Sequence, residues 1–177
     1  MEMALELSQR ARTLRCVANG RVVSLSELQD GIFSRRLMGD GFAVRLRKRR
    51  ELYRGRGFFS AVRYYLLTLI QPPEFVEIVS PADGVVTASG EYLSLRTGDG
   101  VNVSVFHGAN AEFIPQVGEK VRRGAAVCIA ERAALQESLL GGAVVVLFTE
   151  PQQITELHIL TGRHRTGERV AFFKKNK

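Results

Sequence analysis

Short apolar or alternating runs, separated by glycine-containing turns, cover most of this 177-residue chain. Runs of this length, rich in β-branched residues and bounded by turn residues, are typical of β-strands. The predicted strands are 15–18, 21–25, 38–44, 75–79, 85–88, 92–96, 101–106, 125–130, 144–148 and 166–173. They favour a mostly β fold, a glycine-rich antiparallel sandwich or barrel, over any alternation of strands with helices.

Two turn motifs indicate how strands are joined. Asn19-Gly20 lies between two apolar runs and predicts a hairpin, because both central positions of such a turn must accept positive φ. The segment 97–100, Thr-Gly-Asp-Gly, predicts a second hairpin. One pattern occurs twice, at 17–23 and 79–86. It consists of a strand, a small residue, a turn that ends in Asn-Gly or Asp-Gly, and a further strand. This repeat predicts two related β-units that close on each other, a duplicated barrel of the hybrid type.

One or two short helices interrupt the strands. Residues 58–70 carry Arg63 within an apolar run and predict one amphipathic helix that Pro72-Pro73 terminates. The helix either packs over one end of the barrel or forms a surface or partner helix. A second helix is predicted at 132–140. Neither is long enough to span a bilayer, which takes about 20 apolar residues.

A basic cluster precedes the first of these helices. Its members lie within twelve positions and are Arg45, Arg47, Lys48, Arg49, Arg50, Arg54 and Arg56. Only Glu51 offsets them, and the chain as a whole has a net charge of +7. Such a cluster either meets an acidic protein or membrane surface or forms a solvated loop. No recognition motif accompanies it, so a specific nucleic-acid partner is not expected.

The composition suits one domain in a cytoplasmic protein. An apolar fraction of 45% and a charged fraction of 24% are ordinary for a globular chain. The opening residues lack the basic and apolar regions of a signal peptide. We expect an N-terminal tail at 1–14, a single β domain at 15–173 with an inserted basic and helical segment at 47–73, and a basic tail at 174–177.

The candidate chemistry lies at the end of the predicted strand 101–106, where His107 and Gly108 follow. A neutral imidazole at a strand end can serve as a base, a metal ligand or a phosphoryl acceptor. The other histidines, His158 and His164, have no acid or thiol close by in the sequence. Three scattered histidines do not supply a metallopeptidase site, and no lysine marks a biotinyl or lipoyl hairpin, so no metal or cofactor is expected.

The two cysteines, Cys16 and Cys128, lie singly within apolar strand-like runs. Neither belongs to the paired spacing that zinc binding or redox chemistry requires. They are predicted to be buried, reduced thiols.

Six segments, in this order along the chain, resemble the enzyme IIA component of the glucose family in the bacterial phosphoenolpyruvate-dependent sugar phosphotransferase system. They are 17–33, MGDGFAV at 38–44, SPADGVV at 80–86, GVNVSV at 100–105, VGEKVRRG at 117–124 and 144–149. The resemblance covers about 15–173 with one insertion. It implies a compact β-sandwich and a kinase-like phosphohistidine relay without a cofactor. A phosphocarrier protein gives its phosphoryl group to one histidine, which passes it to the IIB domain of a sugar permease.

The sequence departs from this family at the positions that carry the chemistry. Without a gap, Phe106 stands at the place of the phosphoryl-accepting histidine and His107 at the next. Glu91 replaces the second histidine, and Asn110 replaces an aspartate, while Gly108 matches the family. One residue of slip in a strand turns a side chain to the opposite face. His107 therefore reaches the site only if a bulge near Phe106 restores the register.

Two functions follow from the resemblance. In the first, the chain accepts a phosphoryl group on His107, the candidate acceptor. In the second, it is a degenerate IIA-like binding or regulatory protein that docks partners without phosphoryl transfer. The resemblance places the partner-docking face at Ile32, Phe33 and Met38, for which ordinary burial is the alternative.

Overall fold

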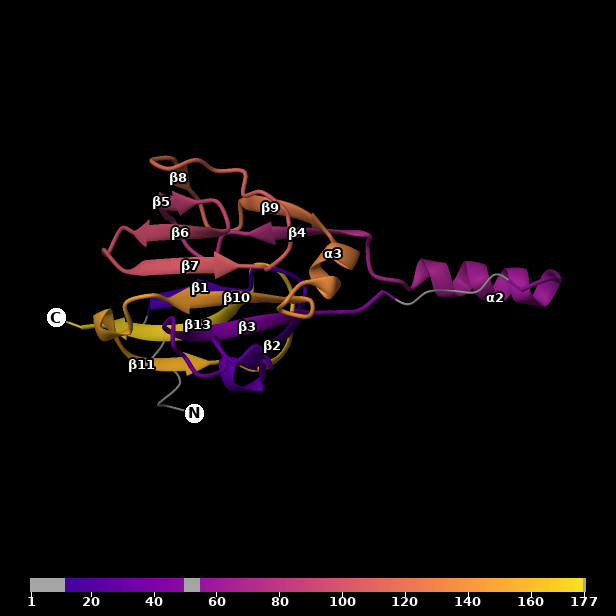
Figure 1. Ribbon diagram of the computed structural model, residues 1–177, viewed down its shortest axis with the longest axis horizontal. Helices are drawn as coiled ribbons and strands as arrows, with labels where there is room; N and C mark the ends of the chain where they lie inside the picture. Colours follow the sequence, from indigo (N-terminus) through magenta and orange to yellow (C-terminus); the bar gives the residue numbers. More distant parts are fainter. Residues whose placement is uncertain (1–11, 50–54, 177) are drawn as a thin grey trace.

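The computed structural model describes residues 12–49 and 55–176, which form a β-barrel with one projecting helical arm (Figure 1). The first strands are β1 (Arg12–Arg15), β2 (Gly20–Ser24), β3 (Asp40–Leu46), β4 (Phe75–Val79), β5 (Gly84–Ser89), β6 (Tyr92–Thr97) and β7 (Asn102–Phe106). The later strands are β8 (Lys120–Val121), β9 (Ala126–Glu131), β10 (Ala143–Phe148), β11 (Ile154–Ile159), β12 (Gly162–His164) and β13 (Arg169–Lys175). The helices are α2 (Phe58–Leu69) and α3 (Arg132–Glu137), with 3-10 turns at Leu25–Glu27 and Pro151–Gln153.

The strands form one large antiparallel sheet and two small ones. The large sheet has the order β12-β2-β3-β10-β7-β6-β5-β8, and the small sheets are β1-β13-β11 and β4-β9. The small sheets close over one face of the large sheet, so that the main core lies between them (Figure 1). The predicted mostly β, antiparallel fold is confirmed.

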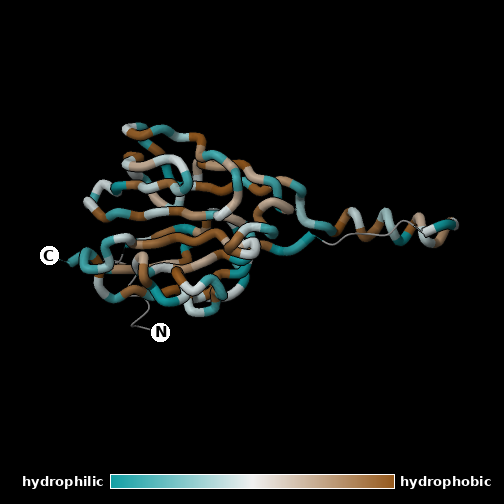
Figure 2. The backbone as a smooth tube through the Cα atoms, in the orientation of Figure 1, coloured by the Kyte–Doolittle hydropathy of each residue, from teal (hydrophilic) through white to brown (hydrophobic). Residues whose placement is uncertain are grey.

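Strand β10 lies at the centre of the large sheet, and all six of its residues are buried. Val144, Val146 and Phe148 face the main core, whereas Val145 and Leu147 belong to a second cluster on the outer face. Successive side chains of a strand point to opposite faces, so a run without polar residues needs cover on both sides. Figure 2 shows this apolar segment between strands of mixed polarity.

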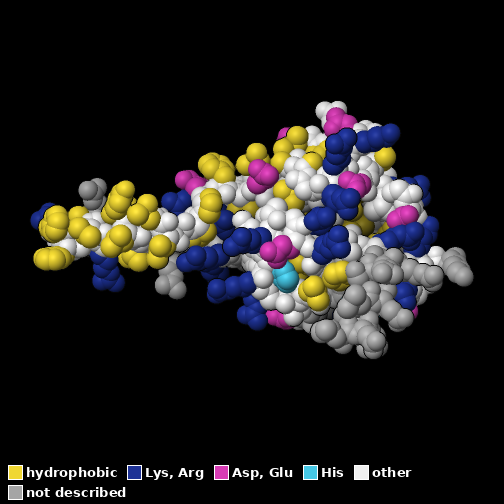
Figure 3. Space-filling view, turned by 180° about the vertical axis from the view of Figure 1, so that it is seen from behind, with side chains coloured by type: hydrophobic (Ala, Val, Ile, Leu, Met, Phe, Trp, Pro, Cys, Tyr) yellow, Lys and Arg dark blue, Asp and Glu magenta, His cyan; other side chains and the backbone are white. Residues whose placement is uncertain are grey.

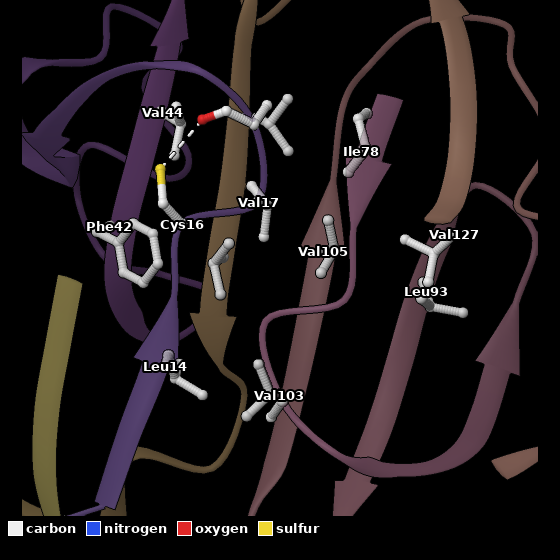
Figure 4. Packing of buried hydrophobic residues seen from close by; sticks show 14 of the residues in the cluster. Leu14, Cys16, Val17, Phe42, Val44, Ile78, Leu93, Val103, Val105 and Val127 are labelled. Carbon is white, nitrogen blue, oxygen red and sulfur yellow. Dashed lines mark hydrogen bonds between the residues drawn. The ribbon is translucent and has the colours of Figure 1, made fainter. Parts of the chain in front are cut away.

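The main core draws side chains from strands far apart in the sequence. Figure 4 shows them converging from both halves of the barrel, with the labelled residues Leu14, Cys16, Val17, Phe42, Val44, Ile78, Leu93, Val103, Val105 and Val127. Cys16 and Cys128 are both buried free thiols. Burial raises the pKa of each thiol to about 11, which keeps both protonated at neutral pH.

The repeated turn motif forms two matching crossings between the sheets. The backbone N–H of Val79 donates to the carbonyl of Val17 at 2.8 Å, so the crossings lie side by side. Cys16 and Ser80 hold equivalent places in them. Each donates from its side chain to the carbonyl two residues further on, at 3.1 Å and 2.7 Å respectively. These matched contacts support the predicted duplication.

The predicted hairpin at Asn19-Gly20 is wrong, whereas the hairpin across 97–100 is confirmed by the pairing of β6 with β7. Strand β1 pairs with β13, and β2 pairs with β3 and β12, so the chain changes sheets at Asn19. Neither Asn19 nor Gly20 has positive φ. The Asn19 carboxamide instead accepts from the Thr166 N–H at 2.9 Å. No larger residue fits at position 20, because a Cβ added to Gly20 would lie 2.5 Å from the Arg45 carbonyl oxygen.

Several boundaries differ from the sequence expectation. The first strand starts at Arg12, inside the predicted tail, and Leu14 is a core residue. The last strand extends to Lys175. Strands β11 and β12 were not predicted, and α3 covers only the first six residues of the expected 132–140 helix.

The arm leaves the barrel between β3 and β4, and its helix α2 projects into solvent (Figure 1). None of the twelve residues of α2 is buried, so the interpretation as a helix packed over the barrel end is wrong. The backbone of the helix lies apart from the strands of the barrel (Figure 1). No helix in the described ranges is both long and apolar enough to cross a membrane.

Candidate functional site

Aromatic side chains gather on the outer face of β6 and β7. Phe106 pairs in register with Tyr92, and their rings stack with centroids 5.0 Å apart and an interplanar angle of 21°. The ring of Phe33 also contacts Phe106, with centroids 5.2 Å apart and an interplanar angle of 58°. Such pairs contribute about 0.5–1.5 kcal/mol each beyond burial. Phe106, which the resemblance aligns with the family's histidine, therefore lies in an aromatic packing site.

Two serines lie next to these rings on the same strands. Ser104 faces Ser94 across the β6–β7 pair, and the Ser104 hydroxyl donates to the Ser94 hydroxyl oxygen at 3.0 Å. Both side chains are buried. Because residues two apart share a face, these serines and the Phe106–Tyr92 pair line one strip of the sheet.

Asp30 holds the loop that brings Phe33 to the sheet. Its carboxylate accepts hydrogen bonds from the N–H groups of Phe33 at 2.7 Å and Ser34 at 3.1 Å. Desolvation disfavours the charged carboxylate, but these backbone N–H groups outweigh it and lower the pKa of Asp30. Phe33 is thereby fixed in the outer cluster with Leu25 and Leu28.

His107 lies on the opposite side of the sheet from Phe106. Strand β7 pairs with β10 and with β6 without a register shift, so no bulge precedes His107. The imidazole is 1% exposed and packs in the main core, where its centroid lies 4.9 Å from the ring of Phe113. This placement differs from the accessible histidine that the phosphoacceptor interpretation requires.

Both ring nitrogens of His107 have partners in the core. The Ala109 N–H donates to Nδ1 at 3.2 Å, and the Cys128 Sγ lies 3.8 Å from Nε2. Burial lowers the pKa of His107, so the ring is neutral at physiological pH. Since Nδ1 accepts a hydrogen bond, the neutral ring carries its single proton on Nε2.

The other residues that the resemblance selected lie in exposed turns. Glu91 precedes β6, and Gly108 and Asn110 follow β7; all three are exposed. Gly108 has a φ of +68°, and an added Cβ would lie 3.2 Å from Leu140 Cγ. The structure thus brings Phe106 together with Tyr92 and Phe33, while His107 faces away from them.

The expected docking face is only partly presented to solvent. Ile32 is 50% exposed and Met38 is 42% exposed, whereas Phe33 is buried and supports the face from below. Tyr92, at 39% exposure, was not selected from the sequence. We call the exposed residues Ile32, Met38 and Tyr92, with the supporting Phe33 and Phe106, the docking surface.

Sequence reasoning missed two further residues at or near the site. Cys128 contacts His107 although 21 positions separate them along the chain, and no local motif indicates such a pair. Tyr92 lies two residues before Ser94 on the same strand, so both side chains point to the same face of the sheet. This spacing was the sequence signal that could have identified Tyr92. Within the described residues, no three His, Cys, Asp or Glu side chains gather as metal ligands would.

Comparison with known proteins identifies a similar fold. A solved structure titled glucose permease IIA from Mycoplasma capricolum matches with a TM-score of 0.68, covering 93% of this chain and 97% of that chain. The sequences are 15% identical, so the likeness shows the fold alone. No protein-family model and no curated protein matches the sequence.

Proposed function

We propose that this chain is a binding or regulatory protein with a IIA-like fold, which docks protein partners at the docking surface without accepting a phosphoryl group on His107. One observation carries the proposal. The outer-face position at the end of β7 holds Phe106, whose ring stacks on Tyr92 and contacts the tilted ring of Phe33, whereas the neighbouring histidine packs in the main core.

Phosphoryl transfer needs an accessible lone pair in line with the leaving group. The Nδ1 lone pair of His107 accepts from the Ala109 N–H, and Nε2 faces the Cys128 sulfur. A phosphoryl donor would have to displace the surrounding core to reach either nitrogen. Phe106, at the solvent side, has no nucleophilic atom. These contacts favour the docking function over the competing one, a working phosphotransferase with His107 as the acceptor.

The docking surface suits protein partners. Ile32, Met38 and Tyr92 are exposed, and Phe33, the chain neighbour of Ile32, packs against Phe106, whose ring stacks on Tyr92. Apolar and aromatic residues of this kind form the centres of protein interfaces. The resemblance to the IIA family and the similar fold of a glucose permease IIA indicate the partner class. We propose phosphocarrier proteins and permease IIB domains as that class, and the cytoplasm as the place where they meet this chain.

A phosphorylation assay separates the two functions. The chain is incubated with enzyme I, phosphocarrier protein and labelled phosphoenolpyruvate, beside an ordinary glucose-family IIA as the positive control. We expect no acid-labile label on this chain, because neither nitrogen of His107 reaches solvent. Label that disappears in His107→Gln, with the variant still folded, would establish the competing function and overturn this one.

A binding measurement tests the docking surface. Ile32→Ser combined with Met38→Ser is expected to weaken binding to the phosphocarrier or IIB partner by about tenfold or more, since each apolar contact contributes about 1 kcal/mol or more. Titrations of the labelled chain followed by NMR give the affinity. Val117→Ser is the matched control, because Val117 is 64% exposed and lies outside the docking surface. Equal losses in both variants, or no binding to either partner, would contradict the proposal.

A further inference from the structure

Helix α2 exposes large apolar side chains that a globular protein normally buries. Phe58 is 77% exposed and Phe59 is 87% exposed. The other exposed apolar residues of the arm are Val62, Tyr65, Leu66, Leu69 and Ile70. In Figure 3 they form a nearly continuous apolar patch along the projecting helix. A contiguous patch of this kind indicates a binding surface.

The exposed residues follow the helical period. Positions 58, 62, 65, 66 and 69 have the spacing that places side chains on one face of an α-helix. The half-buried residues of the helix lie on the other side of it; they are Ser60, Ala61, Tyr64 and Leu67. The exposed apolar residues therefore share one broad face of the helix, with Phe59 and Ile70 at its edge.

Cations surround the root of the arm. The exposed, described cations at this root are Arg45, Arg47, Lys48, Arg49 and Arg56, and Arg63 follows within α2. Figure 3 shows Lys and Arg side chains where the arm joins the barrel and along the lower edge of the helix. Arg50 and Arg54 of the basic cluster lie outside the described residues. One of these cations, Arg49, has an acidic partner in Glu74, at 3.5 Å.

A buried arginine holds the root to the barrel. Arg132, which is 5% exposed, donates from Nε to the Pro73 carbonyl at 2.7 Å and from a terminal nitrogen to the Arg47 carbonyl at 2.8 Å. Its backbone N–H donates to the Glu74 carbonyl at 2.7 Å. The outgoing and returning chains of the arm are thus tied to the start of α3. This clamp fixes the point at which the helix leaves the barrel.

We propose that α2 and the cations around its root bind the surface of an anionic lipid bilayer. An apolar, aromatic helix face beside Lys and Arg is the pattern of helices that lie in the membrane interface. Twelve residues of helix extend about 18 Å, too short to cross the apolar core of a bilayer, so the helix lies along its surface. The cations then meet lipid phosphates, which attract juxtamembrane basic residues.

Charge distinguishes this occupant from a second copy of the chain. Two copies paired in parallel along α2 would bring two basic roots together, and like charges oppose such pairing. An antiparallel pair would separate the roots but leave their cations without a counter-charge. An anionic lipid surface covers the apolar face and neutralises the cations together. The proposal goes beyond the docking function and does not depend on it, because the arm and the docking surface share no residue.

Vesicle flotation with the full chain tests the proposal. We expect the chain to float with vesicles of phosphatidylcholine mixed with phosphatidylglycerol, and to bind pure phosphatidylcholine at least about tenfold more weakly. Phe59→Ser combined with Leu66→Ser should lower binding by about tenfold or more. Arg47→Gln combined with Lys48→Gln should lower it about 25-fold, since each cation contributes about fivefold. The chain has no tryptophan, so Phe59→Trp supplies a single fluorescent reporter whose emission shifts to the blue on insertion.

Ile129→Ser is the matched control, because Ile129 is 56% exposed on β9 outside the arm. It should bind vesicles as the unmodified chain does, and circular dichroism checks that every variant is folded. Three results would overturn the proposal. They are no flotation with anionic vesicles at low salt, equal binding to neutral vesicles, and a dimer in the absence of lipid that Phe59→Ser dissociates.

Discussion

Gly41→Ala is expected to lower the free energy of unfolding by about 3 kcal/mol or more, at the upper end of what overpacking a core costs. Gly41 pairs with Leu147 of β10, and an added Cβ would lie 2.0 Å from the Val146 carbonyl oxygen. The obstacle is backbone at the centre of the large sheet, so β3 and β10 must separate. Urea unfolding followed by circular dichroism measures the effect.

Gly98→Ala is the matched control for this substitution. Gly98 lies in the turn between β6 and β7, nothing lies within 4 Å of its added Cβ, and its φ is outside the left-handed region. Its replacement should change stability by no more than about 0.5 kcal/mol. Similar midpoints for the two variants would mean that the sheet absorbs the extra methyl group. Gly41→Ala should also displace Phe106 of the docking surface, because Phe106 pairs with Val145 of β10, the strand that the substitution pushes away.

The strand pattern predicted much of the barrel because burial imposes it locally. Residues 144–148 are apolar throughout since both faces of β10 are covered, and this is visible in the sequence alone. The segment 154–159 was missed for a physical reason. It mixes polar and apolar residues, Glu156 has a φ of +52°, and its pairing with β13 shifts register. No regular alternation survives such a break.

Turn chemistry was less reliable because long-range contacts override it. Asn19-Gly20 has the residues of a tight hairpin turn, yet the Asn19 side chain is engaged by the turn at Thr166. Glycine is required at position 20 because a Cβ would clash with the Arg45 carbonyl, and not because the backbone has positive φ. A local motif indicates which backbone conformations a segment can adopt. The packing of the sheets then determines which of these conformations is formed.

At the site, the alternation of side chains along 101–106 predicted that His107 would share the face of Val103 and Val105. The structure places all three on the main-core side, with Phe106 opposite. What lay beyond the sequence was the identity of the contacts. Cys128 and Phe113 reach His107 from other parts of the chain, and no local motif indicates either contact.

The stability of the protein is expected to fall as the pH drops below about 6.5, with a slope approaching 1.4 kcal/mol per pH unit that His107 supplies. Burial lowers the pKa of His107 in the folded state from its ordinary value of 6.5. The unfolded chain therefore binds the proton first. The contribution is fully present above pH 6.5 and is lost as the pH falls from there toward the folded pKa. The other ionisable group in contact with the ring, Cys128, stays neutral because burial raises its pKa to about 11.

His107→Leu should remove this slope below about pH 6.5. The substitution should cost about 1 kcal/mol, because the Ala109 N–H loses its acceptor. His158→Gln should leave the slope in place, because solvent reaches that exposed side chain. Chemical denaturation at a series of pH values provides the comparison. A flat profile for the unmodified chain would mean that protons reach the His107 ring in the folded state. In that case the ring nitrogens would also be more accessible to a phosphoryl donor. The same measurement therefore tests both the burial of the imidazole and the expected absence of phosphoryl transfer.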